Sequence, residues 1–349
     1  MATEPATATK GVTTQTPSEV HREEADAAIS WWTVGPGRGE FRAEVLPAPA
    51  DGQVSVRTLW TGVSRGTESL VARGDVPVSE RERMRAPFQA GDFPFPVKYG
   101  YLNVGTVEHG PEDLRGRTVF ALYPHQSRFL VPAEALVRVP DAVPPRRAVL
   151  AGAVETAVNV LWDAAPAIGD RILVVGAGMI GCAIARVARG IPGSEVTLVD
   201  VDPSKAVAAE ALGVGFTLAE DRVPQPDVVI EASGSGAGLQ LALRMAPTDG
   251  EVVVASWYGA TVVPLELGAD FHSRRIAIRS SQVGAVSPRV RSRRTTTERR
   301  GLALRLLQDP AFDALLGARS SWRELPEITA ALAAGTAGDL CQTIDWSAP

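Results

Sequence analysis

Two different patterns of hydrophobic and polar positions divide the chain. Between Ile29 and about Val139 the two kinds of residue alternate over short stretches, as in Gln53–Trp60 (QVSVRTLW), and glycine and proline interrupt them often. A period of two is typical of strands with one buried face, and glycine and proline mark the turns between them. The pattern predicts a β-rich domain with irregular loops.

The pattern changes after Pro144. Ala148–Ala164 carries apolar residues near helical spacing, and helical stretches then separate short apolar runs. Such an alternation predicts a parallel sheet that is covered by helices on both faces. The runs expected to form its strands are Ile172–Val175, Val196–Val199, Val228–Ile230, Val252–Ala255 and Ile276–Ile278.

The alternation ends after Gly284. Arg299–Leu307 and Leu325–Leu332 are expected to be helical, and Leu340–Ile344 is expected to be a final strand. These last elements are expected to complete the β-rich domain, which the parallel sheet interrupts.

The domain boundaries follow from these changes of pattern. We expect the β-rich domain at residues 29–157 and 285–349 and the parallel-sheet domain at residues 158–284. Residues 1–28 are polar and rich in Ala, Thr and Pro, so they are expected to form a disordered leader.

The most specific motif lies in Gly169–Asp202. An apolar run leads into Gly176-x-Gly178-x-x-Gly181, a helical pattern follows, and Asp200 ends the next strand-like run. The glycines of this dinucleotide-binding fingerprint permit a tight turn, close approach to a pyrophosphate and close packing of helix on strand. The helix N-terminus offers N–H groups to the phosphates. The alternative is a doubly wound sheet that has lost its ligand.

Composition narrows the class of protein. The 349 residues are 45% hydrophobic and 21% charged, with a net charge of −5, which indicates a globular two-domain chain without a general attraction to nucleic acid or anionic membranes. The two cysteines, Cys182 and Cys341, imply no disulfide framework. Neither a signal peptide nor a membrane-spanning run is recognised. We expect a cytoplasmic protein whose partner is a small molecule.

The order of the parts and three motifs resemble the medium-chain dehydrogenase/reductase superfamily, the alcohol-dehydrogenase-like enzymes. The motifs are VVGAGMIG, LVDVDPSK and DVVIEASG, and Ala151–Asp170 is similar to the segment that leads into the family's first Rossmann strand. The resemblance implies an α/β fold in which a GroES-like β-rich catalytic domain is interrupted by a Rossmann doubly wound parallel sheet. It also implies a homodimer paired near Arg274–Gln282, where an apolar last strand would otherwise leave an open edge.

All of the family's catalytic zinc positions are replaced in this chain. By the resemblance they fall at Ser64, at Tyr101 and near Gly152, and none of these residues is a normal zinc ligand. We therefore expect a zinc-independent member without a metal site. Its SRGTESL segment is similar to a subgroup that includes bacteriochlorophyllide 3-hydroxyethyl dehydrogenase. The histidines show no ligand spacing; they are His21, His109, His125 and His272.

Hydride transfer at a carbonyl carbon needs a group that stabilises or protonates the oxygen, and without zinc a side chain must do so. Tyr101 is the first candidate, because its phenol can donate to the oxygen, and Lys98 is expected to lower its pKa. Each candidate has a plainer alternative role, which is to satisfy loop backbone groups. The further candidates are Ser64, Glu68, Glu155 and, as a proton shuttle, His125.

The cofactor is expected to be NAD. Asp200 favours NAD over NADP, because a carboxylate accepts hydrogen bonds from the ribose diol and repels a 2′-phosphate. By the resemblance, Arg65 meets the pyrophosphate, Lys205 contacts the adenosine ribose and Thr156 lies near the nicotinamide; a structural salt bridge and a solvated lysine are the alternatives for the two cations. The complete set of expected cofactor contacts is Gly176, Gly178, Met179, Ile180, Gly181, Asp200, Val201, Lys205, Ser233, Arg65 and Thr156.

The segment Arg289–Arg300 (RVRSRRTTTERR) is strongly basic. It is expected to be a solvated loop and helix start, or alternatively a clamp for an anionic substrate. Nucleic-acid binding is disfavoured, because the net charge is negative and no aromatic residues lie between the arginines.

Three functions are compatible with these residues. The first is an NAD(P)-dependent oxidoreductase that transfers hydride between nicotinamide and an alcohol or carbonyl of a small metabolite, with anionic and heterocyclic compounds among the candidates. The second is an NADPH-dependent reductase of an activated C=C bond, of the quinone or enoyl reductase type, which Asp200 disfavours. The third is a non-catalytic nucleotide-binding redox sensor.

Overall fold

The computed structural model describes residues 27–221 and 223–347. Most of the expected leader, and His21, lie outside the described residues. Within these ranges no helix is long and apolar enough to cross a membrane.

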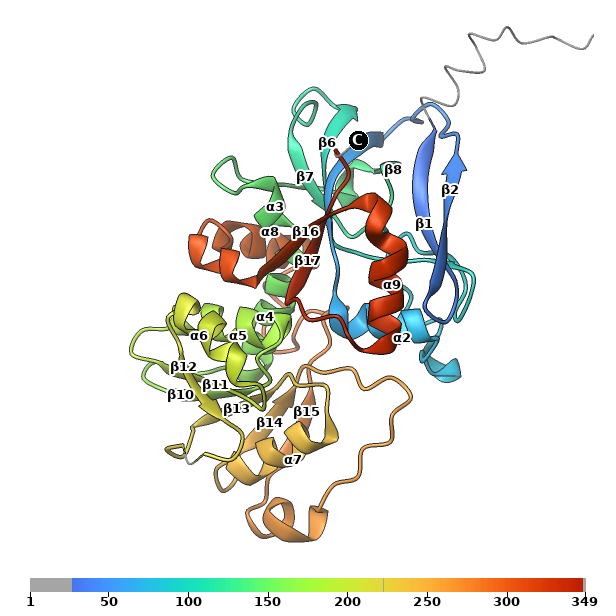
Figure 1. Cartoon of the computed structure of the whole chain (residues 1–349). Helices are drawn as coiled ribbons and strands as arrows, with labels where there is room; N and C mark the ends of the chain where they lie inside the picture. Colours follow the sequence, from blue (N-terminus) through green and yellow to red (C-terminus); the bar gives the residue numbers. More distant parts are fainter. Residues whose placement is uncertain (1–26, 222, 348–349) are drawn as a thin grey trace, which may run out of the picture.

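A six-stranded parallel sheet forms the lower half of the molecule in Figure 1. All of the expected apolar runs form strands, so the prediction of a parallel sheet is confirmed. One edge strand was not predicted, because its four residues form no apolar run and none of them is fully buried. In spatial order the strands are β12 (Gly215–Leu218), β11 (Glu195–Asp200), β10 (Arg171–Val175), β13 (Val228–Glu231), β14 (Glu251–Val254) and β15 (Ala277–Ser280).

The two faces of this sheet are buried in separate cores. Along β10, Ile172 and Val174 point into the core shared with α4 and α5, whereas Leu173 and Val175 point into the core shared with α7. Adjacent residues of a strand face opposite sides, so a run that is apolar throughout fits a sheet covered on both faces. The helices of this half are α4 (Ala151–Ala164), α5 (Met179–Arg189), α6 (Ala206–Leu212) and α7 (Gly236–Met245).

The rest of the described chain forms two antiparallel-rich sheets. A seven-stranded sheet has the order β16-β17-β3-β6-β7-β9, with β8 paired to β3, and a four-stranded sheet has the order β2-β1-β5-β4. Their strands are β1 (Ala28–Gly35), β2 (Arg38–Glu44), β3 (Gln53–Gly62), β4 (Ala90–Gly91), β5 (Val97–Lys98), β6 (Asn103–His109), β7 (Thr118–Ala121), β8 (Arg128–Pro132), β9 (Val137–Arg138), β16 (Leu316–Ser321) and β17 (Cys341–Asp345).

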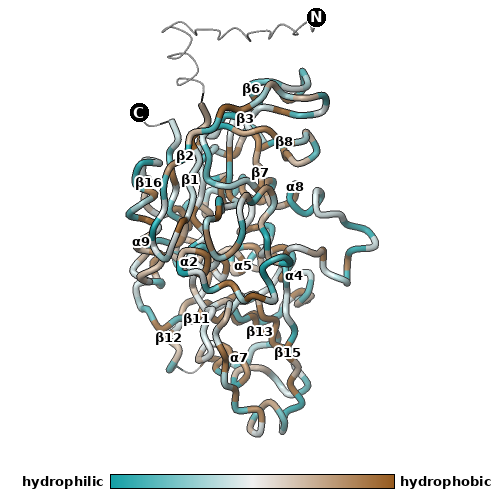
Figure 2. Tube along the Cα trace, turned by 90° about the vertical axis from the view of Figure 1, so that its right-hand side faces the viewer, coloured by the Kyte–Doolittle hydropathy of each residue, from teal (hydrophilic) through white to brown (hydrophobic). Residues whose placement is uncertain are grey.

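The C-terminal segment returns to this β-rich half. Strand β17 pairs antiparallel with β3, and α9 packs on α2, so segments about 280 residues apart lie side by side (Figure 1). The expected C-terminal helices and last strand are confirmed in these positions. In Figure 2 the hydrophobic colour gathers in the interior of both halves. The remaining helices are α2 (Arg65–Arg73), α3 (Pro145–Ala148), α8 (Thr296–Leu306) and α9 (Leu325–Ala334).

Strand β15 lies at the edge of the parallel sheet, and its four residues are exposed. An exposed edge strand presents backbone groups that another strand can pair with. The homodimer through Arg274–Gln282 stays a prediction, and light scattering tests it, because a monomer at micromolar concentration would contradict it. The domain boundaries also stay predictions.

Candidate active site

The glycine-rich loop joins β10 to the N-terminus of α5. Gly176 has a φ of +103°, and a Cβ there would lie 2.5 Å from the Cα of Ser233. A Cβ on Gly181 would lie 1.8 Å from the carbonyl oxygen of Gly176, so helix and loop touch where only glycine fits. A Cβ on Gly178 would meet nothing within 4 Å. The first and third glycines thus shape the turn, and Gly178 leaves open backbone at the helix N-terminus.

Asp200 lies at the mouth of this loop. Its Oδ2 accepts a hydrogen bond from the backbone N–H of Ala177 at 2.7 Å, and its Oδ1 accepts one from the N–H of Asp202 at 3.0 Å. A carboxylate offers about four acceptor sites, so acceptor capacity remains for a ribose diol. The Lys205 ammonium lies 3.7 Å from Asp202, and Val201 is 82% exposed.

Beneath the loop, Glu231 is a buried carboxylate that the sequence reasoning missed. Its Oε1 accepts hydrogen bonds from the backbone N–H and the hydroxyl of Ser233, both at 2.6 Å, and its Oε2 accepts one from Tyr258 at 2.8 Å. Since Gly176 packs on the backbone of Ser233, this carboxylate fixes the wall of the turn. The signal was present in DVVIEASG, where an acid ends an otherwise apolar strand.

Loop, helix terminus and acid fit a dinucleotide. The first backbone N–H groups of α5, at Met179, Ile180 and Gly181, begin a helix whose N-cap residue supplies no side-chain hydrogen bond, so they are free for phosphate oxygens. Arg65 donates to the carbonyl of Ala337 at 3.2 Å, and Thr156 donates to the carbonyl of Gly152 at 2.9 Å. Their roles toward a cofactor stay predictions.

Tyr101 and Ser64 meet, although they are far apart in sequence. The Tyr101 hydroxyl donates to Oγ of Ser64 at 2.6 Å and lies 3.3 Å from Oγ1 of Thr67. Ser64 is the N-cap residue of α2, whose first turn carries Thr67. At the third expected zinc position, a Cβ on Gly152 would lie 2.5 Å from Leu102 Cδ2, so a side chain there would require the buried Leu102 to shift.

The replaced positions thus hold hydroxyl groups and a glycine. Within residues 27–221 and 223–347, no group of three His, Cys, Asp or Glu side chains is placed to hold a metal ion.

Glu68 and His125 form a buried pair behind Ser64. The carboxylate accepts the backbone N–H of Ser64 at 2.7 Å and lies 3.0 Å from Nε2 of His125, whose Nδ1 lies 2.7 Å from the Thr61 hydroxyl. For a neutral imidazole beside a carboxylate, Nε2 donates to Glu68 and Nδ1 accepts from Thr61. That hydroxyl accepts in turn from the Trp346 indole at 3.0 Å. The chain of contacts fixes the loop that carries Ser64.

Lys98 is not a partner of Tyr101. Its ammonium donates to Gln126 at 2.7 Å and to Glu44 at 3.1 Å. Burial raises the pKa of Tyr101 to about 12, against the lowering effect of its hydrogen bonds with Ser64 and Thr67. The expected lowering by Lys98 is therefore wrong. The strand ends at Lys98 and Gly100 turns the chain with a φ of +113°, so nearness in sequence was misleading.

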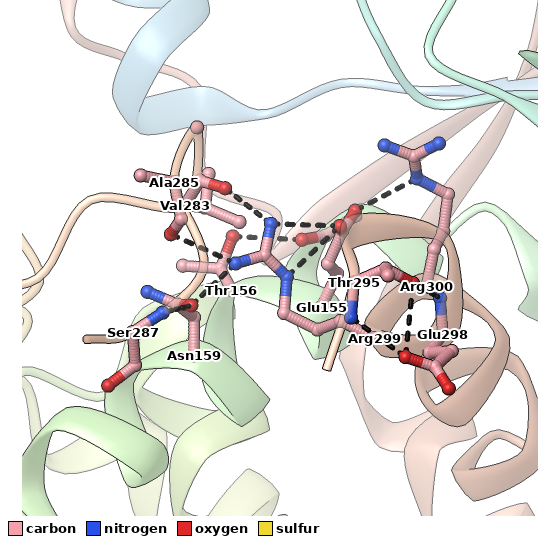
Figure 3. Close-up of polar contacts among 12 residues, drawn as sticks. Glu155, Thr156, Asn159, Val283, Ala285, Ser287, Thr295, Glu298, Arg299 and Arg300 are labelled. Atoms are coloured by element: carbon pink, nitrogen blue, oxygen red, sulfur yellow. Dashed lines mark hydrogen bonds and ion pairs between the residues drawn. The ribbon is translucent and has the colours of Figure 1, made fainter. Parts of the chain in front are cut away.

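Glu155 is held by two arginines of α8 (Figure 3). Its Oε1 accepts from Arg299 Nη2 at 3.1 Å and its Oε2 accepts from Arg300 Nε at 3.2 Å. The Arg299 guanidinium also donates to Asn159 Oδ1 and to the carbonyls of Val283 and Ala285. This geometry gives Glu155 the role of an anchor. The expectation that the basic segment is simply solvated is wrong for Arg299, whose side chain is 1% exposed.

One polar face of α4 holds the segment that follows β15. Asn159 accepts the Ser287 N–H at 3.0 Å, and Asp163 accepts the Ser281 hydroxyl at 2.6 Å. The side chains at positions 155, 159 and 163 are four residues apart, so they project from the same side of the helix. The helix thereby positions the segment that the family resemblance places beside the nicotinamide.

The comparisons with known proteins agree with this geometry. No protein-family model matches the sequence. The zinc-type alcohol dehydrogenase-like protein YphC of Escherichia coli K12 is 30% identical over 167 residues, which are 44% of this chain and 47% of YphC. Sorbitol dehydrogenase of Mus musculus is 24% identical over 39% of this chain and 42% of its own length. The aligned part thus spans less than half of these relatives.

Longer similarity is found with RspB of E. coli K12, which is 22% identical over 69% of this chain and 79% of RspB. Among solved structures, L-idonate 5-dehydrogenase of E. coli superposes with a TM-score of 0.75 and 15% identity, covering 91% of this chain and 98% of that one. An RspB structure from E. coli CFT073 with NADH has a TM-score of 0.72 and 16% identity, covering 92% and 99%. The fold is that of these dehydrogenases.

These relatives and the shared fold support the resemblance to the medium-chain dehydrogenase/reductase superfamily. The structural likeness confirms the expected fold class, a GroES-like catalytic domain with a Rossmann domain. The assignment of Ser64, Tyr101 and Gly152 to the family's zinc-ligand positions stays a prediction.

Arg299 is predicted to matter for stability more than its neighbour Arg300. Arg299→Met leaves polar groups of Glu155, Asn159 and two carbonyls without their buried donor, and breaking a buried ion pair typically costs about 3–5 kcal/mol of the free energy of unfolding. Urea denaturation, monitored by circular dichroism, measures the free energy of unfolding of each variant. Arg300→Met, at a side chain that is 13% exposed, is the control and should cost less; equal small losses for both variants would refute the anchor.

The tyrosines are predicted to lose their phenol protons at a higher pH than a solvent-exposed tyrosine does. Burial is the first cause of a raised pKa for all four, Tyr99, Tyr101, Tyr123 and Tyr258. For Tyr101, the folded pKa of about 12 exceeds the usual 10.0, so the unfolded chain loses this proton first. Its contribution to stability is complete below pH 10 and disappears as the pH rises toward 12. Tyrosinate absorbance that appears at pH 10 in still-folded protein would contradict this.

Proposed function

We propose that the protein is a zinc-independent, NAD-dependent oxidoreductase that acts on an alcohol or carbonyl group of a small metabolite. One observation carries the proposal. The hydroxyl groups of Tyr101 and Ser64 are 2.6 Å apart at two positions where the superfamily places zinc ligands, in a chain that also has an intact dinucleotide loop.

Tyr101 is proposed as the hydrogen-bond donor to the reacting oxygen. A bound nicotinamide supplies or accepts the hydride at the carbonyl carbon. Because burial raises the pKa of Tyr101 to about 12, the phenol keeps its proton at neutral pH and is suited to donate a hydrogen bond to an oxygen that becomes negative. Ser64 and Thr67, whose hydroxyl oxygens lie 2.6 and 3.3 Å from the phenol oxygen, can donate hydrogen bonds to it when the phenol proton turns to the reacting oxygen.

Glu68 and His125 are proposed to position this donor. Glu68 holds the backbone of Ser64, and His125 holds Glu68. Glu155 is also proposed as a positioning residue, because its ion pairs with α8 hold helix α4, which carries Gly152 and Thr156. Positioning of this kind matters because small displacements of a donor reduce its effect in the transition state.

The two alternatives are weaker. A reductase of activated C=C bonds that uses NADPH would need room for a 2′-phosphate, and Asp200 lies where that group would be repelled. The fold itself accepts either cofactor, since a Sinorhizobium meliloti structure with a TM-score of 0.71 and 19% identity, covering 91% of this chain and 99% of that one, holds NADP. A non-catalytic redox sensor would have no need of the paired hydroxyls.

Tyr101→Phe is predicted to lower turnover about a hundredfold, because one donor to a developing oxyanion is lost, while the affinity for NADH stays nearly constant. Initial rates are measured with substrates taken from the names of two similar dehydrogenases, sorbitol and L-idonate. Tyr99→Phe is the control, since its ring lies 6.1 Å from that of Tyr101 in an edge contact. If Tyr101→Phe has nearly the turnover of the wild type, the Tyr101 hydroxyl is not the donor and the side chain contributes only to packing.

Asp200→Asn is predicted to narrow the preference for NADH over NADPH by about tenfold, since the amide keeps an oxygen for Ala177 N–H but removes the charge that repels a 2′-phosphate. Calorimetry with both cofactors measures the ratio. Equal affinities in the wild-type protein would overturn the assignment of Asp200.

Zinc independence is tested by elemental analysis of the purified protein and by turnover after treatment with a chelator. We expect substoichiometric zinc and unchanged turnover, because Ser64, Tyr101 and Gly152 provide no normal ligand. Zinc near one ion per chain, or turnover that falls with chelation, would refute this part of the proposal.

A further inference from the structure

A groove with a volume of about 450 Å³ lies on the outer side of α4, away from the paired hydroxyls. Its floor is α4 and its walls are α5, α8 and the loop before α8; Figure 1 shows α4 beside these two helices. The C-terminal half of α5 lines it, whereas the glycine-rich loop lies at the N-terminus of that helix. The lining residues are Val158, Leu161, Trp162, Ala165, Pro166, Val187, Ile191, Arg289, Val290, Arg293, Leu302 and Leu306.

The groove is apolar except for two cations. Arg289 and Arg293 are its charged lining residues, and no acidic side chain is among them. Arg289 donates from Nε to the carbonyl of Asp163 at 3.1 Å, which fixes its guanidinium beside the groove. Within the described ranges, no hydrogen bond or ion pair engages the exposed guanidinium of Arg293. Arg299 and Arg300, in the same basic segment, are instead bound to Glu155.

We propose that this groove binds a small molecule with an apolar body and one carboxylate. Ligand sites of proteins are concave and mostly apolar, measure about 300–1,000 Å³, and hold a few polar groups that fix the ligand's orientation. The planar guanidinium of Arg293 matches a carboxylate with two parallel hydrogen bonds. The aliphatic walls and the Trp162 indole accommodate the body. This assigns the guanidinium of Arg293, with that of Arg289 beside it, to an anion other than the substrate of the dehydrogenase site.

The charge distribution favours a carboxylate over a neutral apolar ligand or a second copy of the chain. A neutral ligand would leave the guanidinium groups of Arg289 and Arg293 without an anionic partner. A second copy of the chain would have to insert an apolar side chain into the groove and place a carboxylate beside these two arginines at the same time. Arg291 is exposed in the same loop and adds to the positive potential, but it does not line the groove. A variant of Arg291 therefore measures the general attraction between charges without a direct contact to the ligand.

The test uses decanoate as the probe and calorimetry with the full-length protein, with no cofactor added, so its outcome does not depend on the proposed dehydrogenase activity. Decanoate should bind at one site per chain, and decanol, with the same chain and no charge, about tenfold more weakly. Arg293→Gln should reduce the affinity for decanoate to that for decanol. Arg291→Gln is the matched control and should bind like the wild type.

Trp162→Phe provides a second readout. The change in tryptophan fluorescence on adding decanoate should be present in the wild type and absent in this variant, whose fold is checked by its circular dichroism spectrum. The proposal is overturned if decanoate does not bind up to its solubility limit, if the two arginine variants lose affinity equally, or if Arg293→Gln changes the oligomeric state while decanoate has no effect.

Discussion

The buried guanidinium of Arg299 joins the parts of the structure on which the site depends. Removing a guanidinium from water is costly unless its donors are paired, and burial lowers its pKa against the opposing effect of Glu155. Here the donors reach a carboxylate, an amide and two carbonyls, which belong to α4 and to the segment after β15. Because the chain passes from the parallel sheet back to the β-rich half through this segment, the cluster links both halves to the same helix.

Helix α4 therefore makes three kinds of contact, each on a different face. Its apolar side belongs to the core beneath the sheet, its polar side holds the segment after β15, and its first turn places Gly152 against Leu102 beside Tyr101. A helix bound on several faces cannot shift without disturbing all of them. The contact between Tyr101 and Ser64 is thus set by packing that lies well beyond the two residues, in agreement with the burial of Ser64 and the partial burial of Tyr101.

Much of this could be predicted from the sequence, because it rests on local pattern. Apolar runs such as Ile172–Val175 mark buried parallel strands, and Gly176 and Gly181 lie where a Cβ would collide with backbone. The edge strand β12 escaped prediction, since a strand at the rim of a sheet needs no apolar run. Contacts between distant segments escaped as well: nothing in the spacing of Glu155 and Arg299, 144 positions apart, shows that they meet, and Lys98 was assigned to the wrong partner.

The contact between Gly152 and Leu102 bears on how this chain could change in evolution or in the laboratory. A ligand side chain introduced at Gly152 would collide with Leu102, a residue that is 1% exposed and thus has little space to move. Any larger side chain at position 152 therefore has to displace Leu102, and a smaller residue at position 102 would relieve this contact. Such a residue by itself creates a cavity and lowers stability, so the two positions are expected to change together.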